Sequence, residues 1–111
     1  MCEEKIKAVV TQLAKEARKI YGADLCNVIL YGSCARGDFA NDSDIDIMIL
    51  LDVEQEEIGE ARKKILDVSD RIDMEYDVVL APVIQCWQLY NRYMTVSRFF
   101  QNVEKEGIKF A

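Results

Sequence analysis

Two aspartates beside an apolar run are the side chains of this sequence best placed to do chemistry. Asp44 and Asp46 are separated by one residue, and the apolar run 47–51 follows them. Because alternate residues of a strand point to the same face, roughly 6.6 Å apart along the chain, the two carboxylates should project together. Such a pair repels itself unless a cation neutralises it. We therefore predict that Asp44 and Asp46 bind a hard divalent cation, Mg²⁺ or Mn²⁺.

A Gly-Ser turn upstream of the aspartates supplies groups that suit phosphate. Gly32 lets the backbone approach a ligand closely, and Ser33 adds a hydroxyl and an N–H. Arg36 carries a planar guanidinium that also suits phosphate. Because Mg²⁺ is commonly bound by one or two carboxylates together with substrate phosphates, these residues predict a site for ATP or another nucleoside triphosphate. The alternative interpretation is that the aspartates form only a turn and the entry to a strand.

The motif GSCARG at residues 32–37, followed by SDIDI at 43–47, resembles the signature of the nucleotidyltransferase superfamily of the DNA polymerase β type. The short chain is similar to the minimal nucleotidyltransferases, which are found in prokaryotes beside HEPN-domain partners. The resemblance implies an α/β (α+β) fold, a mixed β-sheet flanked by helices. It also implies Mg-dependent transfer of a nucleoside monophosphate from an NTP to an acceptor hydroxyl, and AMP is the monophosphate that we expect.

The resemblance assigns roles to individual residues. Asp44 and Asp46 would hold the metals of a two-metal site. Gly32 and Ser33 would hold the β- and γ-phosphates, and Arg36 would neutralise charge on the leaving pyrophosphate.

Members of this superfamily take a third carboxylate from a neighbouring strand, in a hydrophobic-Asp-hydrophobic-hydrophobic context. Asp77, within the segment Tyr-Asp-Val-Val at 76–79, is the match that we expect, and Asp73 is the competing one. In this role Asp77 would bind the catalytic metal and accept or orient the proton of the acceptor hydroxyl.

Apolar periodicity predicts the elements that position these residues. Strands are expected at 25–31, at 45–51 and at 74–80, the last carrying Asp77 and ended by Pro82. Helices are expected at 2–21, after Asp52 with a buried face from 58 to 68, and at 82–93. Ser97 should cap a last helix that Gly107 ends, and 108–110 should add an edge strand. The aromatic residues after Pro82 are expected to fill the core; the alternatives are a partner surface or an adenine-stacking wall.

Composition narrows the class of protein. The 111 residues, half of them hydrophobic, predict a single nucleotidyltransferase domain over 1–111. Neither a long apolar run nor a signal peptide is present, so we expect a cytoplasmic protein without a membrane span. A net charge of −6 with scattered lysines and arginines argues against bulk nucleic acid as the substrate. Histidine is absent, so any general base must be a carboxylate or water.

The sequence leaves the acceptor open among three kinds. A protein side chain, such as a tyrosine of a HEPN-domain toxin, would give the chain an antitoxin role. Enzymes that modify small molecules of the aminoglycoside type generally carry an additional substrate domain, for which this chain has no room. An RNA end is disfavoured by the lack of basic surface. A rival of another class is a non-catalytic antitoxin that binds nucleotide or partner, as a homo- or hetero-oligomer.

Overall fold

A four-stranded mixed sheet with helices on both faces forms the protein, and the computed structural model describes residues 1–111 throughout. The strand order is β3-β2-β1-β4. Strand β1 runs antiparallel to both β2 and β4, whereas β2 and β3 are parallel. The elements in chain order are α1 (Glu3–Tyr21), β1 (Leu25–Tyr31), α2 (Ser33–Arg36), β2 (Ile45–Leu51), α3 (Ile58–Tyr76), β3 (Leu80–Cys86), α4 (Trp87–Arg92), α5 (Arg98–Glu106) and β4 (Ile108–Lys109).

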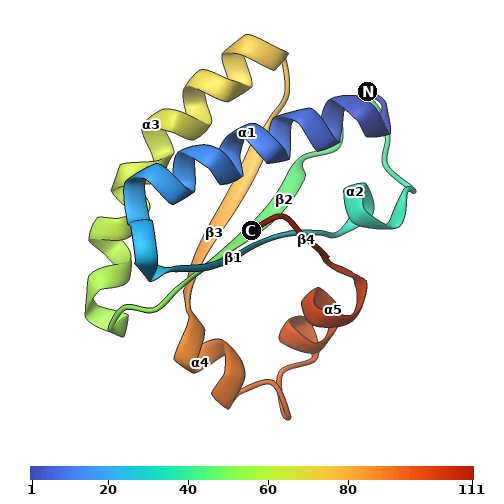
Figure 1. The fold of residues 1–111 in the computed structure, drawn as a ribbon. Helices are drawn as coiled ribbons and strands as arrows, with labels where there is room; N and C mark the ends of the chain where they lie inside the picture. Colours follow the sequence, from blue (N-terminus) through green and yellow to red (C-terminus); the bar gives the residue numbers. More distant parts are fainter.

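Helices α1 and α3 cover one face of the sheet (Figure 1). Leu13 of α1, Ile65 of α3, Val28 of β1, and Ile47 and Ile49 of β2 are completely buried in the main core. Each large aliphatic side chain buried in this way stabilises the fold by roughly 1.5–3 kcal/mol. The parallel connection from β2 to β3 passes through α3, which is the usual way to join two parallel strands.

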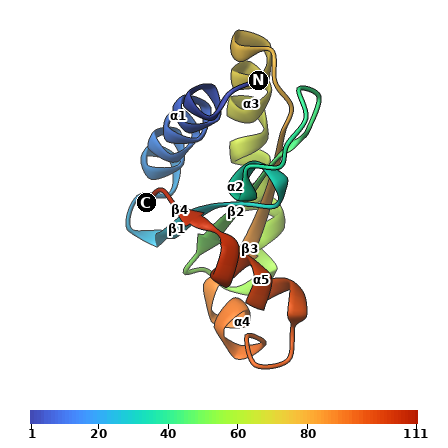
Figure 2. The same ribbon diagram turned by 90° about the vertical axis from the view of Figure 1, so that its right-hand side faces the viewer.

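Helices α4 and α5 lie on the opposite side of the sheet, below it in Figures 1 and 2. They enclose a second, smaller cluster made by Ile29, Met48, Leu50, Tyr90 and Val103. Alternation along β2 places Asp46 on this face together with Met48 and Leu50. The C-terminal helices therefore form a wall on the face that carries the aspartate.

The structure corrects the expected strand at 74–80. Helix α3 continues to Tyr76, and Asp77 ends it in the left-handed conformation with φ +55°. The side chain of Met74 is 86 % exposed, which fits the outer surface of a helix end. Short apolar alternation over 74–80 does not distinguish a helix end from a strand, and here the helix continues because 58–76 forms one amphipathic face against α1.

The third strand instead spans Leu80–Cys86, so Pro82 lies within it and does not end it. Strand β3 is an edge strand, and an edge strand tolerates a proline because one of its sides forms no ladder. The helix expected at 82–93 is correspondingly shorter and begins at Trp87.

Several other expected elements are observed, but the aromatic residues after Pro82 do not all fill the core, since Tyr90 is buried whereas Trp87 and Phe99 are exposed. Strands β1 and β2 have the predicted limits, and α1 begins within one residue of the prediction. The hydroxyl of Ser97 accepts a hydrogen bond from the N–H of Phe100 at 3.1 Å, which caps α5. Strand β4 pairs with β1 at the edge of the sheet. No helix combines the length and the apolar character that a membrane crossing requires.

Candidate active site

Asp46 lies at the beginning of β2, on the face of the sheet toward α4 and α5. In the register of the sheet it is opposite Tyr31 of β1 and Ala81 of β3. Its neighbours Ile45 and Ile47 are completely buried on the other face, as expected. Asp44 precedes the strand and is exposed. Burial of both isoleucines fixes the direction in which Asp46 points.

The carboxylate of Asp46 packs directly against the backbone of Gly32. A Cβ atom built on Gly32 would lie 2.5 Å from Oδ2 of Asp46, closer than atoms can approach. Gly32 also has φ +75° and ψ −156°, a conformation that is essentially confined to glycine. Close approach and backbone conformation therefore both require glycine at this position, and they bring the motif turn and the aspartate together.

The rest of the motif forms α2, a single helical turn. The carbonyl of Gly32 accepts hydrogen bonds from the N–H groups of Ala35 and Arg36, both at 3.1 Å. The thiol of Cys34 is buried and donates to the backbone carbonyl of Asp44 at 3.6 Å. Cys34 thus ties the turn to the segment that enters β2, a role that its place in the sequence did not reveal.

Arg36 is held by two carboxylates. Its Nε lies 3.3 Å from Oδ2 of Asp38, and its Nη1 lies 3.3 Å from Oε2 of Glu106 on α5. The contact with Glu106 joins the motif to the C-terminal helix across the chain, and sequence spacing carries no signal for it. Both pairs are exposed, so they orient the guanidinium more than they stabilise the fold.

The electrostatics of the site reflect two neighbouring carboxylates. Burial raises the pKa of the Asp46 carboxyl, the charge of Asp44 raises it further, and Arg36 lowers it. Burial and the charge of Asp46 also raise the pKa of the Tyr31 hydroxyl and of the Cys34 thiol. Asp46 therefore lies in a region of excess negative charge, which a cation would relieve.

The expected third carboxylate is placed differently. Asp77 ends helix α3 and lies outside the strand that faces Asp46, so its assignment to a strand face is wrong. Asp77 lines a small pocket together with Asp42 and Ser43, which belong to the segment before Asp44. Asp73 accepts a hydrogen bond from the N–H of Leu80 at 2.8 Å, which gives it a part in the turn between α3 and β3.

Asp44 and Asp46 are the two expected metal ligands that lie close enough for the charge of one to act on the other. No group of three or more Asp, Glu, Cys or His residues comes together in a way that could hold a metal ion. Asp44 and Asp46 alone still fit one Mg²⁺, because this ion is usually held by one or two carboxylates with substrate phosphates and water as its other ligands. Participation of Asp77 in the reaction stays a prediction.

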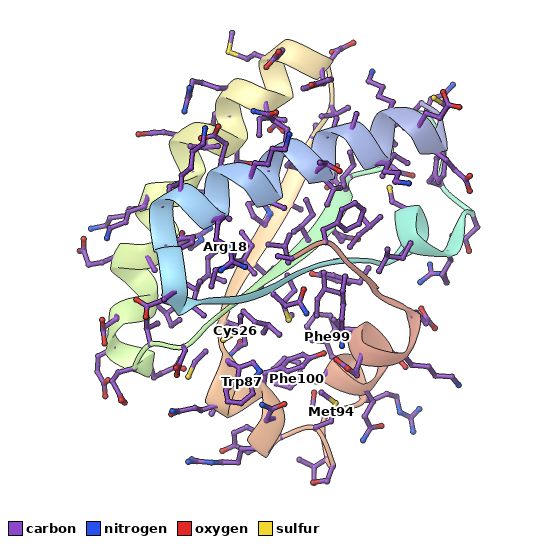
Figure 3. All side chains as sticks on the ribbon, viewed as in Figure 1. Arg18, Cys26, Trp87, Met94, Phe99 and Phe100 are labelled. Atoms are coloured by element: carbon purple, nitrogen blue, oxygen red, sulfur yellow. The ribbon has the colours of Figure 1, made fainter.

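A cavity of about 270 Å³ opens beside the motif turn, between α5 and the end of β1. Tyr31, Gly32 and Arg36 line one side of it, and Phe99, Asn102, Val103 and Glu106 line the other. Figure 3 shows Phe99 and Phe100 on the side of α5 that faces the rest of the molecule. The sequence offered no spacing that joins α5 to the motif, although an adenine-stacking wall among the C-terminal aromatics was one of its alternatives.

Comparisons with known proteins agree with this arrangement. Residues 10–105 match the family model described as "Nucleotidyltransferase domain". "Putative protein adenylyltransferase MJ0141" of Methanocaldococcus jannaschii is 31% identical over 101 residues, which are 91% of this chain and 94% of that protein. "Putative protein adenylyltransferase MJ0604" of the same organism is 34% identical over 108 residues, 96% of each chain.

Solved structures with the same fold include toxin–antitoxin proteins. One is a toxin–antitoxin crystallised with AMP-PNP, with a TM-score of 0.52 and 18% identity, covering 100% of this chain and 73% of that one. Another is a variant of the toxin–antitoxin MntA–HpeT in which two aspartates, two positions apart, are replaced by glutamate. Its TM-score is 0.52 and its identity is 17%, and the match covers 100% of this chain and 73% of that one. These likenesses support the fold, and the match over 10–105 shows that the chain belongs to the nucleotidyltransferase domain family.

Proposed function

We propose that this protein transfers AMP from ATP to a hydroxyl group of a partner protein. The oxygen of the acceptor hydroxyl attacks the α-phosphorus, the bond from that phosphorus to the bridging oxygen breaks, and pyrophosphate leaves. The hydroxyl proton passes to a carboxylate or to water, because the chain contains no histidine. The products are the adenylylated partner and pyrophosphate.

The observation that carries this proposal is the contact between Asp46 and Gly32. A carboxylate beside a Gly-Ser turn suits a metal–nucleotide complex, because Mg²⁺ would be held by carboxylates together with substrate phosphates. Asp44 and Asp46 would hold Mg²⁺ or Mn²⁺. The ion would neutralise charge on the phosphates and polarise them.

The remaining roles belong to the chain's own groups. The turn at Gly32 and Ser33 would hold the triphosphate, and Ser33 offers it a hydroxyl. Arg36 lies beside the turn and would offset the charge that develops on the leaving pyrophosphate. Asp77 could act on the acceptor only if the acceptor approaches from the end of α3, because it is not on the strand beside Asp46.

A protein acceptor is favoured by the relatives and by the surface. The relatives MJ0141 and MJ0604 carry protein adenylyltransferase in their names, and proteins of the same fold belong to toxin–antitoxin pairs. Several large apolar side chains are exposed on this chain, among them Val79 just before β3, Val83 within it and Trp87 directly after it. We therefore propose a HEPN-domain toxin as the partner and a hydroxyl side chain of that toxin, such as tyrosine, as the acceptor.

The same exposed apolar side chains favour a second candidate function, an antitoxin that acts by contact alone. Such a protein would block its partner without needing ATP. The glycine-only conformation of Gly32 against Asp46 supports the enzyme instead, because a contact surface has no need of such a turn packed against a carboxylate.

The decisive experiment measures transfer of labelled AMP from ATP to the HEPN-domain partner in the presence of Mg²⁺. We expect labelling with the wild type and none with Asp46→Asn. Asp67→Asn, which removes an exposed carboxylate on α3, serves as the matched control and should label normally. If the partner is neutralised equally well without ATP and without label, the contact-only antitoxin is the better description.

A further inference from the structure

The cavity between α5 and the motif turn has a partly apolar lining that includes two aromatic rings. It holds about 270 Å³ and lies directly beside Gly32, so a group bound there would be continuous with phosphates bound at the turn. Pockets for complete drug-sized ligands are generally larger, roughly 300–1,000 Å³. The cavity therefore suits one part of a nucleotide and not the whole of it.

Phe99 gives the cavity an aromatic wall. Its side chain is 48 % exposed, an unusual degree for phenylalanine, although it also contacts the ring of Tyr31 edge-on at 5.6 Å and 79°. Tyr31 fixes the orientation of the Phe99 ring and leaves part of that ring uncovered. A ring fixed in this way can stack on a nucleobase, since every base presents a π-face.

Charge decides which part of the nucleotide enters. The carboxylate of Glu106 lines the cavity, and that of Asp46 lies against Gly32, which lines the cavity too. Arg36 lines the side of the cavity next to the turn, where it would meet phosphate, whereas Glu106 on α5 can accept a hydrogen bond from the exocyclic amino group of a base. Only one oxygen of Glu106, Oε2, contacts Arg36, so the carboxylate has a second oxygen for such a donor.

Asn102 adds a group that can distinguish bases. It lies one helical turn before Glu106 on α5, lines the same cavity, and is exposed. A carboxamide can pair in a bidentate manner with the N6 amino group and N7 of adenine. Uracil has no exocyclic amino group and cannot donate one to Glu106 or Asn102.

We propose that this cavity binds the base of the nucleotide and selects adenine, with Phe99 stacking on the ring and Asn102 and Glu106 contacting its amino edge. The proposal rests on the proposed function, because it assumes that the triphosphate occupies the turn at Gly32 and Ser33. It adds specificity-determining residues on α5, far in sequence from the motif.

The test separates the base from the phosphates. Calorimetry on the full chain with Mg²⁺ compares AMP-PNP, UMP-PNP and inorganic tripolyphosphate for the wild type, Phe99→Ala, Asn102→Ala and the control Tyr93→Ala. Tyr93 is an aromatic residue of similar exposure, 45 %, that does not line the cavity. We expect Phe99→Ala to weaken AMP-PNP at least about tenfold without changing tripolyphosphate binding. Asn102→Ala should reduce the preference for AMP-PNP over UMP-PNP, and Tyr93→Ala should bind all three ligands normally.

Other outcomes contradict the proposal in distinguishable ways. If tripolyphosphate binds but neither Phe99→Ala nor Asn102→Ala alters AMP-PNP affinity, the base binds elsewhere and this inference is wrong. Unaltered AMP-PNP binding with slower transfer in Phe99→Ala would instead assign the cavity to the acceptor side chain. If Phe99→Ala weakens AMP-PNP and tripolyphosphate equally, the substitution has disturbed the packing of α5. The exposed Asn102 then provides the test: an unchanged preference for AMP-PNP over UMP-PNP in Asn102→Ala would show that the inference is wrong. If the wild type binds none of the ligands, the proposed function itself fails.

Discussion

The carboxylate of Asp46 occupies the space that a side chain at Gly32 would need, because Oδ2 would lie 2.5 Å from a Cβ there. We expect Gly32→Ala to displace Asp46 and to strain the backbone, where φ is +75°. The strain alone should lower the free energy of unfolding by about 1–3 kcal/mol. Nucleotide affinity should fall with it, and denaturant unfolding and calorimetry measure the two effects.

The control is Gly59→Ala in helix α3. A Cβ on Gly59 meets nothing within 4 Å, and its φ is ordinary. Alanine there should raise the free energy of unfolding by up to about 1 kcal/mol, since glycine within a helix is unfavourable. A Gly32→Ala protein as stable as wild type, with normal nucleotide affinity, would show that the contact with Asp46 has no role.

Replacing Asp46 should separate activity from stability. Asp46→Asn should reduce the rate of AMP transfer at least about 10²-fold, because a metal ligand supplies several kcal/mol of transition-state stabilisation. The melting temperature of the metal-free protein should stay equal or rise, since burial and Asp44 both disfavour the charge at this position. Equal Mg²⁺ and nucleotide affinities in the wild type and in the Asp44→Asn, Asp46→Asn double variant would contradict the metal site.

Asp73 and Asp77 should respond differently to substitution. Asp73→Ala removes the acceptor for the N–H of Leu80 and should destabilise the fold by about 1 kcal/mol. Asp77→Asn should leave the melting temperature nearly unchanged, because asparagine tolerates the left-handed conformation at φ +55°.

Activity then tests the predicted third carboxylate. If Asp77 accepts the acceptor's proton, Asp77→Asn should lower the rate of transfer at least about 10²-fold. A normal rate in Asp77→Asn combined with a large loss in Asp73→Asn, at equal stability, would move the role to Asp73.

Deprotonation of Tyr21 should lower the free energy of unfolding at alkaline pH. Its hydroxyl donates a hydrogen bond to the carbonyl of Ala61, which links α1 to α3, and burial raises the pKa of Tyr21 to about 12. An unfolded tyrosine titrates near pH 10, so the folded protein holds this proton more tightly. The stabilisation is therefore complete below about pH 10 and is lost as pH rises toward about 12.

Tyr21→Phe checks this expectation. The variant should lose about 1 kcal/mol of stability at neutral pH, where the hydrogen bond is intact. Between pH 10 and 12 its stability should change less than that of the wild type. Parallel slopes for the two proteins across this range would mean that another group controls the alkaline transition.

The centre of the site could be predicted from sequence because it depends on local chemistry. Asp44 and Asp46 flank Ile45. Because alternate residues of a strand point to opposite faces, burial of Ile45 and Ile47 in the main core turns Asp46 toward the other face of the sheet. The Gly-Ser turn follows a strand that pairs with β2, so neighbouring residues of the motif are also neighbours in space. Strands β1 and β2 carry strong apolar runs, and such runs are the most reliable local signals.

The surroundings of the site could not be predicted because they depend on packing between distant segments. The place where α3 ends and β3 begins depends on the hydrogen bond from the N–H of Leu80 to Asp73. The apolar alternation over 74–80 gives no sign of this contact. Arg36 meets Glu106 from the far end of the chain. The position of α5 over the motif turn results from the small cluster around Met48 and Tyr90, and no motif marks it.

Strand β2 on one side of the site and helix α5 on the other should differ in how easily they open locally, because they are packed into cores of different size. Strand β2 is central in the sheet and is buried between α1, α3 and the C-terminal helices, so its amide hydrogens should exchange only when the whole protein unfolds. Helix α5 is anchored by the cluster of five buried residues, and its amides should exchange through smaller openings that leave β2 intact. Asp46, which lies in β2, would thus keep its position while the wall carrying Phe99 opens and closes, and this opening would give a bound nucleotide a route in and out.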